Sequence, residues 1–250
     1  MILKYTFAGN KNNSIKKITA MTKTISCQEC ENNRCLVKNY CDEKWLEKVD
    51  EVKEQLFETE GQHIFSEGQR VRGVYIIQQG KVKIISDEMR GKLRVVRIAG
   101  NGHFIGHHAL NYETYPVNAV TIENSTICFI DNENLYQIFM KNPKLTYEVM
   151  KFYVVELQKL ESRLKNSTLL DCREKVAEAL LVIKDVFGVS SIDKSLNGNL
   201  TRMDIAEMAG ENVENVIRNL SKFESEGFIT KKGKKLILKD EEGLKKLIMN

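Results

Sequence analysis

The sequence predicts an α+β protein in which an antiparallel β-roll is followed by a long helix and then by a small helical domain with a β-hairpin. Residues 61–133 contain short runs of β-branched and apolar residues separated by glycines, which is typical of antiparallel strands joined by turns. Residues 144–167 repeat apolar residues every three or four positions, which indicates one long helix. Helical patterns return after residue 168 and end in two β-like runs around Gly233.

Composition places the chain among globular proteins. It has 250 residues, of which 42% are hydrophobic and 29% charged, with a net charge of +4. No apolar run approaches the roughly 18 residues of a membrane span, and the N-terminus lacks the apolar stretch of a signal peptide. We therefore expect a cytoplasmic protein that does not contact membranes. In that reducing compartment clustered cysteines are more often metal ligands or redox thiols than disulfides.

Residues 1–60 are predicted to form a tail, a cysteine-rich arm and a short docking helix. Residues 1–24 have little apolar periodicity, which predicts a mobile tail. Apolar residues at helical spacing then predict a helix with one inward face, namely Trp45, Val49, Val52, Leu56 and Phe57.

Residues 61–142 are predicted to form the β-roll domain. The strand-like runs are VYIIQ, KVKII, LRVVRI, VNAVTI and TICFI. Such runs favour strands because β-branched side chains pack well on a pleated surface. A brief helix is expected over residues 134–142.

The long helix is predicted over residues 143–167, where Pro143 suits the first turn. Its apolar residues form a narrow seam, namely Met150, Tyr153, Leu157, Leu160 and Leu164. A seam this narrow usually pairs two helices, so it predicts a homodimer. Packing of the seam against the chain's own β-roll is the alternative.

Four of the six cysteines are spaced so that one metal centre could collect them. Cys27, Cys30 and Cys35 lie in ISCQECENNRC, and Cys128 lies in the strand-like segment STICFID. Four thiolates can hold an iron-sulfur cluster or zinc, and the distant sulfur would tie the arm to the roll. Cys41 is the alternative to Cys35 as the third N-terminal ligand. Thiols that bind no metal are the remaining alternative.

Residues 168–250 are predicted to form a winged helix-turn-helix that binds DNA. Thr201 can cap the first helix with Asp204 three residues on, and Gly210 supplies the turn. In the second helix, Glu214 and Arg218 are one turn apart, as an acceptor for cytosine and a donor to guanine must be. A salt bridge between them on a solvated face is the alternative.

The remaining contacts with double-stranded DNA are expected around this helix and on the hairpin, whose lysines would contact phosphates. The inner face of the second helix is predicted to be Val213, Val216, Leu220 and Phe223. The predicted DNA-binding residues are Thr201, Arg202, Asn212, Val213, Glu214, Asn215, Ile217, Arg218, Lys222, Lys232 and Lys234.

This order of β-roll, seam helix and winged helix resembles the CRP/FNR family of bacterial transcription regulators from about Ser26 to the C-terminus. The resemblance implies a cyclic-nucleotide-binding-like jelly roll, a homodimer, a palindromic promoter site and RNA polymerase as a further candidate partner. Glu214 and Arg218 match the family's V-E-x-x-x-R reading positions. Val213 agrees with the FNR branch, whereas Ile217 stands where that branch has serine.

Within the family the cysteines resemble those of FNR-like oxygen sensors. The resemblance implies a [4Fe-4S] cluster on the N-terminal cysteines and Cys128, whose loss in oxygen breaks the DNA-binding dimer. The chain departs from the enteric FNR pattern because four residues, rather than five, separate Cys30 from Cys35. Zinc and bare thiols stay open as alternatives.

The segment that matches the cyclic-nucleotide site of cAMP-responsive relatives lacks their polar groups. His107 replaces the carboxylate, and residues 116–118 supply no arginine for the phosphate. Burying a phosphodiester charge without its partner is costly, so cAMP is not expected as a ligand.

An enzyme is not expected, because the sequence carries no HExxH, GxSxG, P-loop or dinucleotide fingerprint. The alternative function is a β-roll dimer that acts as a protein-binding module responsive to thiol chemistry, zinc or another ligand, without DNA readout.

Overall fold

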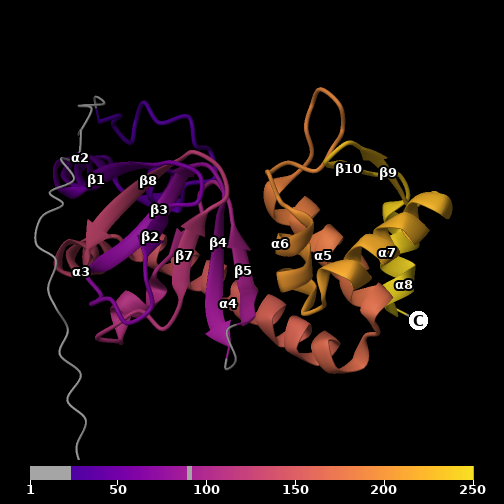
Figure 1. Ribbon diagram of the computed structural model, residues 1–250. Coiled ribbons are helices and arrows are strands. Elements are labelled where there is room, and N and C mark those ends of the chain that lie inside the picture. Colours follow the sequence, from indigo (N-terminus) through magenta and orange to yellow (C-terminus); the bar gives the residue numbers. More distant parts are fainter. Residues whose placement is uncertain (1–23, 89–91, 250) are drawn as a thin grey trace, which may run out of the picture.

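The computed structural model describes residues 24–88 and 92–249, which form two domains joined by one long helix (Figure 1). The expected tail lies outside the described residues apart from Thr24. Within the described ranges, no helix is both long and apolar enough to cross a bilayer.

The cysteine arm leads into helices α1 (Leu36–Tyr40) and α2 (Glu43–Val52), and α2 buries Leu46 and Val49. The expected docking helix ends earlier than predicted, because Glu54–Glu58 forms strand β1. The prediction was therefore wrong at Leu56 and Phe57. Backbone pairing of β1 with β8 stabilises an extended conformation here, and side-chain spacing alone does not reveal such pairing.

The β-roll consists of two four-stranded antiparallel sheets, with strand orders β1-β8-β3-β6 and β2-β7-β4-β5. All five predicted strands are confirmed, as β3, β4, β5, β7 and β8. Strands β2 and β6 were not predicted, since three and two residues are too few for a period-2 pattern to stand out. The remaining bounds are β2 His63–Phe65, β3 Gly73–Gln79, β4 Val82–Glu88, β5 Lys92–Ala99, β6 Phe104–Ile105, the 3-10 helix η1 His107–Leu110, β7 Asn118–Thr121 and β8 Ser125–Asp131.

The space between the two sheets is filled by aromatic and β-branched side chains. Phe65 stacks on Tyr115 with ring centroids 4.1 Å apart, and the Tyr115 hydroxyl donates to the Gly73 carbonyl at 2.9 Å. Ile77 and Ile127 are fully buried in the same cluster. The arm and the helices that follow therefore pack against a roll with a well-packed core.

Helix α3 (Asn132–Lys141) is followed by α4 (Pro143–Leu169), which begins at the proline as expected. The first turns of α4 bury Leu145 and Val149 against the roll. The exposed seam of α4 consists of Tyr147, Met150, Val154, Leu157, Leu160 and Leu164. Leu160 also lines a cavity together with residues of the roll.

Tyr153 belongs to the predicted set but is not among these exposed residues, and its contact with a second copy stays a prediction. Its side chain is half-buried, and its ring lies 5.4 Å from that of His107 and 5.2 Å from that of Phe152. Its position on the helix turns the ring toward η1 of the roll, and Val154 occupies the exposed side instead.

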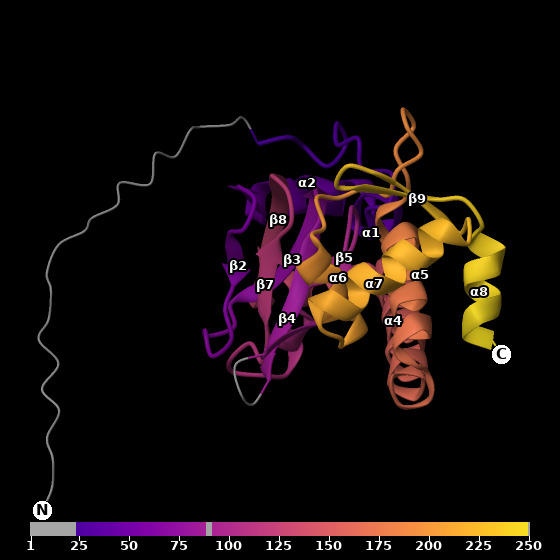
Figure 2. The same cartoon turned by 45° about the vertical axis from the view of Figure 1, so that its right-hand side comes forward.

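The C-terminal domain contains the predicted helices and hairpin (Figure 2). Gly188 ends the first helix as its C-cap, and Gly233 turns the hairpin with a positive φ. The last helix was not predicted. The bounds are α5 Cys172–Phe187, α6 Arg202–Ala209, α7 Val213–Ser225, β9 Ile229–Lys232, β10 Lys235–Leu238 and α8 Glu241–Met249.

Helix α6 lies against the outer face of the roll, beside strands β4 and β5 (Figure 2). Ile98 of β5 and Ile205 of α6 belong to one buried hydrophobic cluster. At its edge the Lys83 ammonium binds Asp204 at 2.5 Å. Arg163 of α4 donates to the carbonyls of Val96 at 2.9 Å and of Met208 at 3.3 Å. These contacts fix the DNA-binding domain against the roll and the long helix.

Candidate functional site

The first helix of the helix-turn-helix is capped as predicted. The Thr201 hydroxyl accepts from the Asp204 backbone N–H at 3.1 Å, and the Asp204 carboxylate accepts from the Thr201 N–H at 2.8 Å. Burial alone would raise the pKa of Asp204, but hydrogen bonds from Lys83 and Thr201 outweigh it and hold that pKa below its usual value. Gly210 adopts the left-handed φ of +67° that the turn needs. The predicted capping box and turn are confirmed.

Helix α7 buries the predicted inner face. Val216, Leu220 and Phe223 are almost fully buried, and Val213 is half-buried against the same core. Val213 therefore packs inward, although it also stood among the predicted DNA contacts. The prediction missed Asn219, which is buried and donates to the Asn215 carbonyl at 3.0 Å and to the Cys172 sulfur at 3.3 Å. Its spacing from Val216 and Phe223 places it on the inner face, but a polar side chain is not expected to be buried there.

The outer face of α7 presents Glu214, Ile217 and Arg218 to solvent. Within the described residues no ion pair joins Glu214 to Arg218, so the salt bridge considered as an alternative is not formed. Arg218 instead donates to the Asn215 side-chain oxygen at 2.6 Å. Asn215 is half-buried and held by the N-cap Asn212, so it orients the arginine. The face offers one acceptor, one apolar side chain and one guanidinium.

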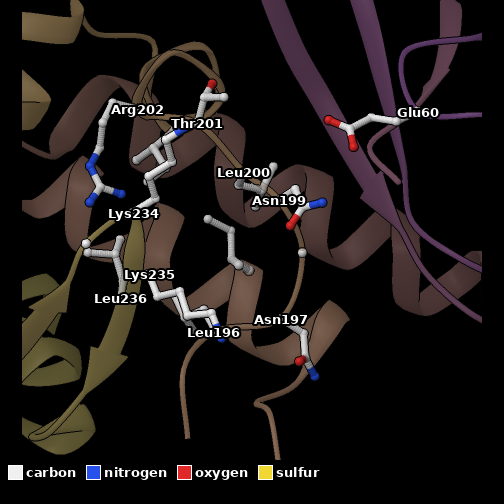
Figure 3. A pocket seen from close by; sticks show the side chains of 14 residues that line it. Glu60, Leu196, Asn197, Asn199, Leu200, Thr201, Arg202, Lys234, Lys235 and Leu236 are labelled. Atoms are coloured by element: carbon white, nitrogen blue, oxygen red, sulfur yellow. The ribbon is translucent and has the colours of Figure 1, made fainter. Parts of the chain in front are cut away.

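The remaining predicted DNA contacts are four basic residues and Thr201. Thr201, Lys222, Lys232 and Lys234 are exposed, and Arg202 is half-buried. Arg202 and Lys234 lie on one side of a cavity of about 630 Å³, and Glu60 of the roll lies on the other (Figure 3). In the described part of the chain neither Lys232 nor Lys234 forms an ion pair, whereas Lys231 pairs with Glu224 and Lys235 with Asp193. The two unpaired lysines are the ones at the tip of the hairpin.

Four cysteines surround one small cavity between the arm, α2 and the sheet. Cys27, Cys30, Cys35 and Cys128 all line it, and Val49, Gln55 and Ile76 are among the residues that complete its wall. Cys41 does not line the cavity, because its thiol points to the Asn142 side-chain oxygen at 3.4 Å. The arrangement thus brings together the three N-terminal cysteines nearest in sequence and the strand cysteine.

The sulfur atoms are chemically suited to a thiophilic metal centre. Burial raises the pKa of Cys27 to about 12 and that of Cys128 to about 11, and it also raises the pKa of Cys35. These thiols therefore carry their protons at neutral pH until a cation displaces them. Soft sulfur donors around one cavity fit an iron-sulfur cluster or tetrahedral zinc.

Among the described residues no group of three or more His, Cys, Asp or Glu side chains is placed to hold a metal ion as it stands. The cavity volume is about 20 Å³, room for about one water, so a larger occupant requires the thiols to move apart.

Charged and amide groups hold two of the four sulfurs. The Lys53 ammonium donates to the Cys27 sulfur at 3.2 Å and to Asp50 at 2.5 Å. Burial alone would lower the pKa of Lys53, but these bonds raise it. Near the strand cysteine, the Gln55 amide N–H lies 3.9 Å from the Cys128 sulfur. Lys53 and Gln55 were not predicted as part of the site, because nothing in the local sequence EVKEQ distinguishes a buried lysine from a solvated one.

A second cavity lies between the roll and Leu160 of α4 and includes His107, which belongs to the segment compared above with cyclic-nucleotide sites. Its volume is about 140 Å³, and its wall is mainly apolar, with Arg97 and His107 as the polar exceptions. The Arg97 guanidinium is already engaged by Glu156 at 2.5 Å and by the Phe104 carbonyl at 3.0 Å. Arg97 is therefore not free to pair with a phosphodiester, and the absence of cAMP binding stays a prediction.

Comparison with known proteins agrees with this architecture. A family model described as the cyclic nucleotide-binding domain matches residues 58–142, and one described as the Crp-like helix-turn-helix domain matches residues 174–247. The fumarate and nitrate reduction regulatory protein of Vibrio cholerae is 24% identical over 234 residues, which cover 93% of this chain and 94% of that protein. The protein of the same name from Escherichia coli is 23% identical over 235 residues, with coverage of 93% and 94%.

Solved structures share the fold. FixK2 from Bradyrhizobium japonicum superimposes with a TM-score of 0.70 at 18% identity, covering 78% of this chain and 97% of that one. A variant of CooA from Carboxydothermus hydrogenoformans gives a TM-score of 0.69 at 20% identity, with coverage of 86% and 95%. Both domain matches, the full-length relatives and the order of β-roll, long helix and capped helix-turn-helix agree. The chain therefore belongs to the CRP/FNR family of DNA-binding transcription regulators.

Proposed function

We propose that the protein is a homodimeric transcription regulator whose sequence-specific DNA binding depends on a [4Fe-4S] cluster held by Cys27, Cys30, Cys35 and Cys128. The observation that carries the proposal is the convergence of these four cysteines, one of them about ninety residues away in sequence, on one cavity. The full-length relatives named as fumarate and nitrate reduction regulators add support. When bound, the cluster supplies a redox-sensitive bond between the arm and the roll.

The residues after the cysteines connect the arm to the seam helix. Asn142, the N-cap residue of α4, accepts from the Asp42 backbone N–H at 3.0 Å and from the Cys41 thiol. Lys144 lies 5.6 Å from the ring centre of Tyr40. A change in arm position therefore acts directly on the start of α4, which is the element that carries the exposed seam.

The exposed seam of α4 is the proposed dimer contact. Apolar surface is exposed along the seam of α4, which consists of Tyr147, Met150, Val154, Leu157, Leu160 and Leu164, and a second copy of this helix would bury it. Pairing of two α4 helices would set two α7 helices at half-site spacing on a palindrome. Cluster loss, by loosening the arm, would shift the equilibrium toward monomers that bind the site weakly.

Replacing Arg218 by alanine is expected to weaken binding to a specific palindrome by about 1–3 kcal/mol, because the exposed guanidinium would no longer contact a guanine edge. Binding to a scrambled duplex should hardly change. Fluorescence anisotropy on both duplexes measures the difference.

The matched control is Lys234→Ala, which removes one exposed cation at the hairpin tip. It should weaken binding to both duplexes equally, because a phosphate contact carries no sequence information. It should also make the affinity less dependent on salt concentration. Equal losses on the two duplexes for Arg218→Ala would contradict direct reading by α7.

A further inference from the structure

Lys53 places a buried positive charge at the edge of the cysteine cavity. It ends helix α2 as the C-cap residue, and only 2% of its side chain is exposed. Its ammonium makes three contacts, with the Cys27 sulfur at 3.2 Å, the Ile25 carbonyl at 2.8 Å and Asp50 at 2.5 Å. A lysine this deeply buried is rare unless a partner holds its charge.

Asp50 binds this ammonium and also accepts hydrogen bonds from the backbone of Cys27. Its carboxylate accepts from the Cys27 backbone N–H at 2.8 and 3.1 Å, so one acidic side chain holds both the ligand's main chain and the lysine beside its sulfur. Asp50 is itself 24% exposed, so water screens its charge more than that of Lys53. The pair therefore presents its positive end to the sulfur.

The other polar groups near the cavity do not place a positive charge beside a sulfur atom. The Lys38 ammonium binds the Cys30 carbonyl rather than a sulfur. Gln55 and Gln78, which approach the Cys128 sulfur at 3.9 and 3.7 Å, are neutral and bind each other at 2.7 Å. Within the described residues Lys53 is thus the one cation that donates to a cavity sulfur.

We propose that the Lys53–Asp50 pair sets the reduction potential and the air stability of the cluster, with Lys53 stabilising its more reduced, more negative states. The inference rests on the proposed function. Four thiolates bring four negative charges to the site, and net charge and hydrogen bonds to sulfur are among the main determinants of cluster potentials. A unit charge a few ångströms from the sulfur, shielded from water, acts strongly on that balance.

The test is a set of variants whose effects have opposite sign. Lys53→Met removes the cation at similar size, so it should lower the midpoint potential and make the visible absorbance of the cluster decay about tenfold faster in air, with dioxygen as the oxidant. Asp50→Asn keeps an oxygen to accept from Cys27 but removes the negative charge. It should raise the potential and slow the decay, and the double variant should lie between the two. Potentials come from an anaerobic dye titration and decay rates from absorbance after air is admitted.

Lys53→Arg keeps the charge and should stay close to the parent protein. Lys48→Met removes an exposed lysine of helix α2 that pairs with Glu51, and should change neither quantity. If Lys53→Met and Asp50→Asn both speed the decay to the same extent, the pair is a structural clamp and the charge proposal is wrong. Unchanged potentials in both variants would refute it as well. Parent protein purified without air that lacks iron and sulfide would instead refute the proposed function itself.

Discussion

Replacing Cys128 by serine is expected to abolish the brown colour of protein purified without air. Cys128 is the one cavity cysteine supplied by the β-roll, and its sulfur lies on strand β8 opposite the arm. A hydroxyl is a much poorer ligand for iron than a thiolate, so the arm would lose its link to the roll. Iron, acid-labile sulfide and visible absorbance measure the loss, which should be nearly complete.

Cys41→Ser is the matched control, because Cys41 lies in the same stretch of chain but its thiol contacts Asn142 outside the cavity. This variant should keep its full iron and sulfide content. If Cys41→Ser loses the cluster while Cys35→Ser retains it, the ligand set is wrong. Colourless parent protein with one zinc per chain would show that the same sulfurs bind zinc.

Replacing Leu157 by glutamate should convert the dimer into a monomer. Leu157 is 56% exposed in the middle of the seam, where a second α4 helix would cover it and a buried carboxylate would have no partner. Affinity for the palindrome should fall by at least about a hundredfold, since the two half-sites would no longer be bound as one unit. Sedimentation velocity without air measures the assembly state, and anisotropy measures the affinity.

Ser162→Glu adds the same charge to an exposed position of the same helix, outside the seam. It should leave the protein dimeric and able to bind DNA. A Leu157→Glu protein that remains a dimer at micromolar concentration would place the dimer contact elsewhere and remove the link between the arm and DNA binding.

Local patterns predicted most of this fold. The capping box at Thr201, the turn at Gly210 and the glycine-bounded strands depend on neighbours within a few residues, so the sequence reveals them directly. The reading helix was predicted for the same reason, because Val216, Leu220 and Phe223 recur at the helical period.

Features that depend on distant segments were missed. Leu56 lies in a strand because β8 offers it a pairing edge, and Tyr153 turns inward because η1 lies beside it. Lys53 is buried because the arm folds back over it, and Asn219 because α5 brings Cys172 within 3.3 Å. In each case the deciding contact joins segments far apart in the chain, and no local pattern encodes it.

DNA binding by one preparation before and after exposure to air tests most directly whether the cluster controls sequence-specific binding. Protein purified anaerobically, with its iron and sulfide content known, is titrated against a palindromic duplex and a scrambled duplex by fluorescence anisotropy. Before exposure to air, binding to the palindrome should be tight and specific. Afterwards both the visible absorbance and the preference for the palindrome should be lost. Specific binding that is unchanged after the cluster has gone, or that appears only then, would contradict control by the cluster.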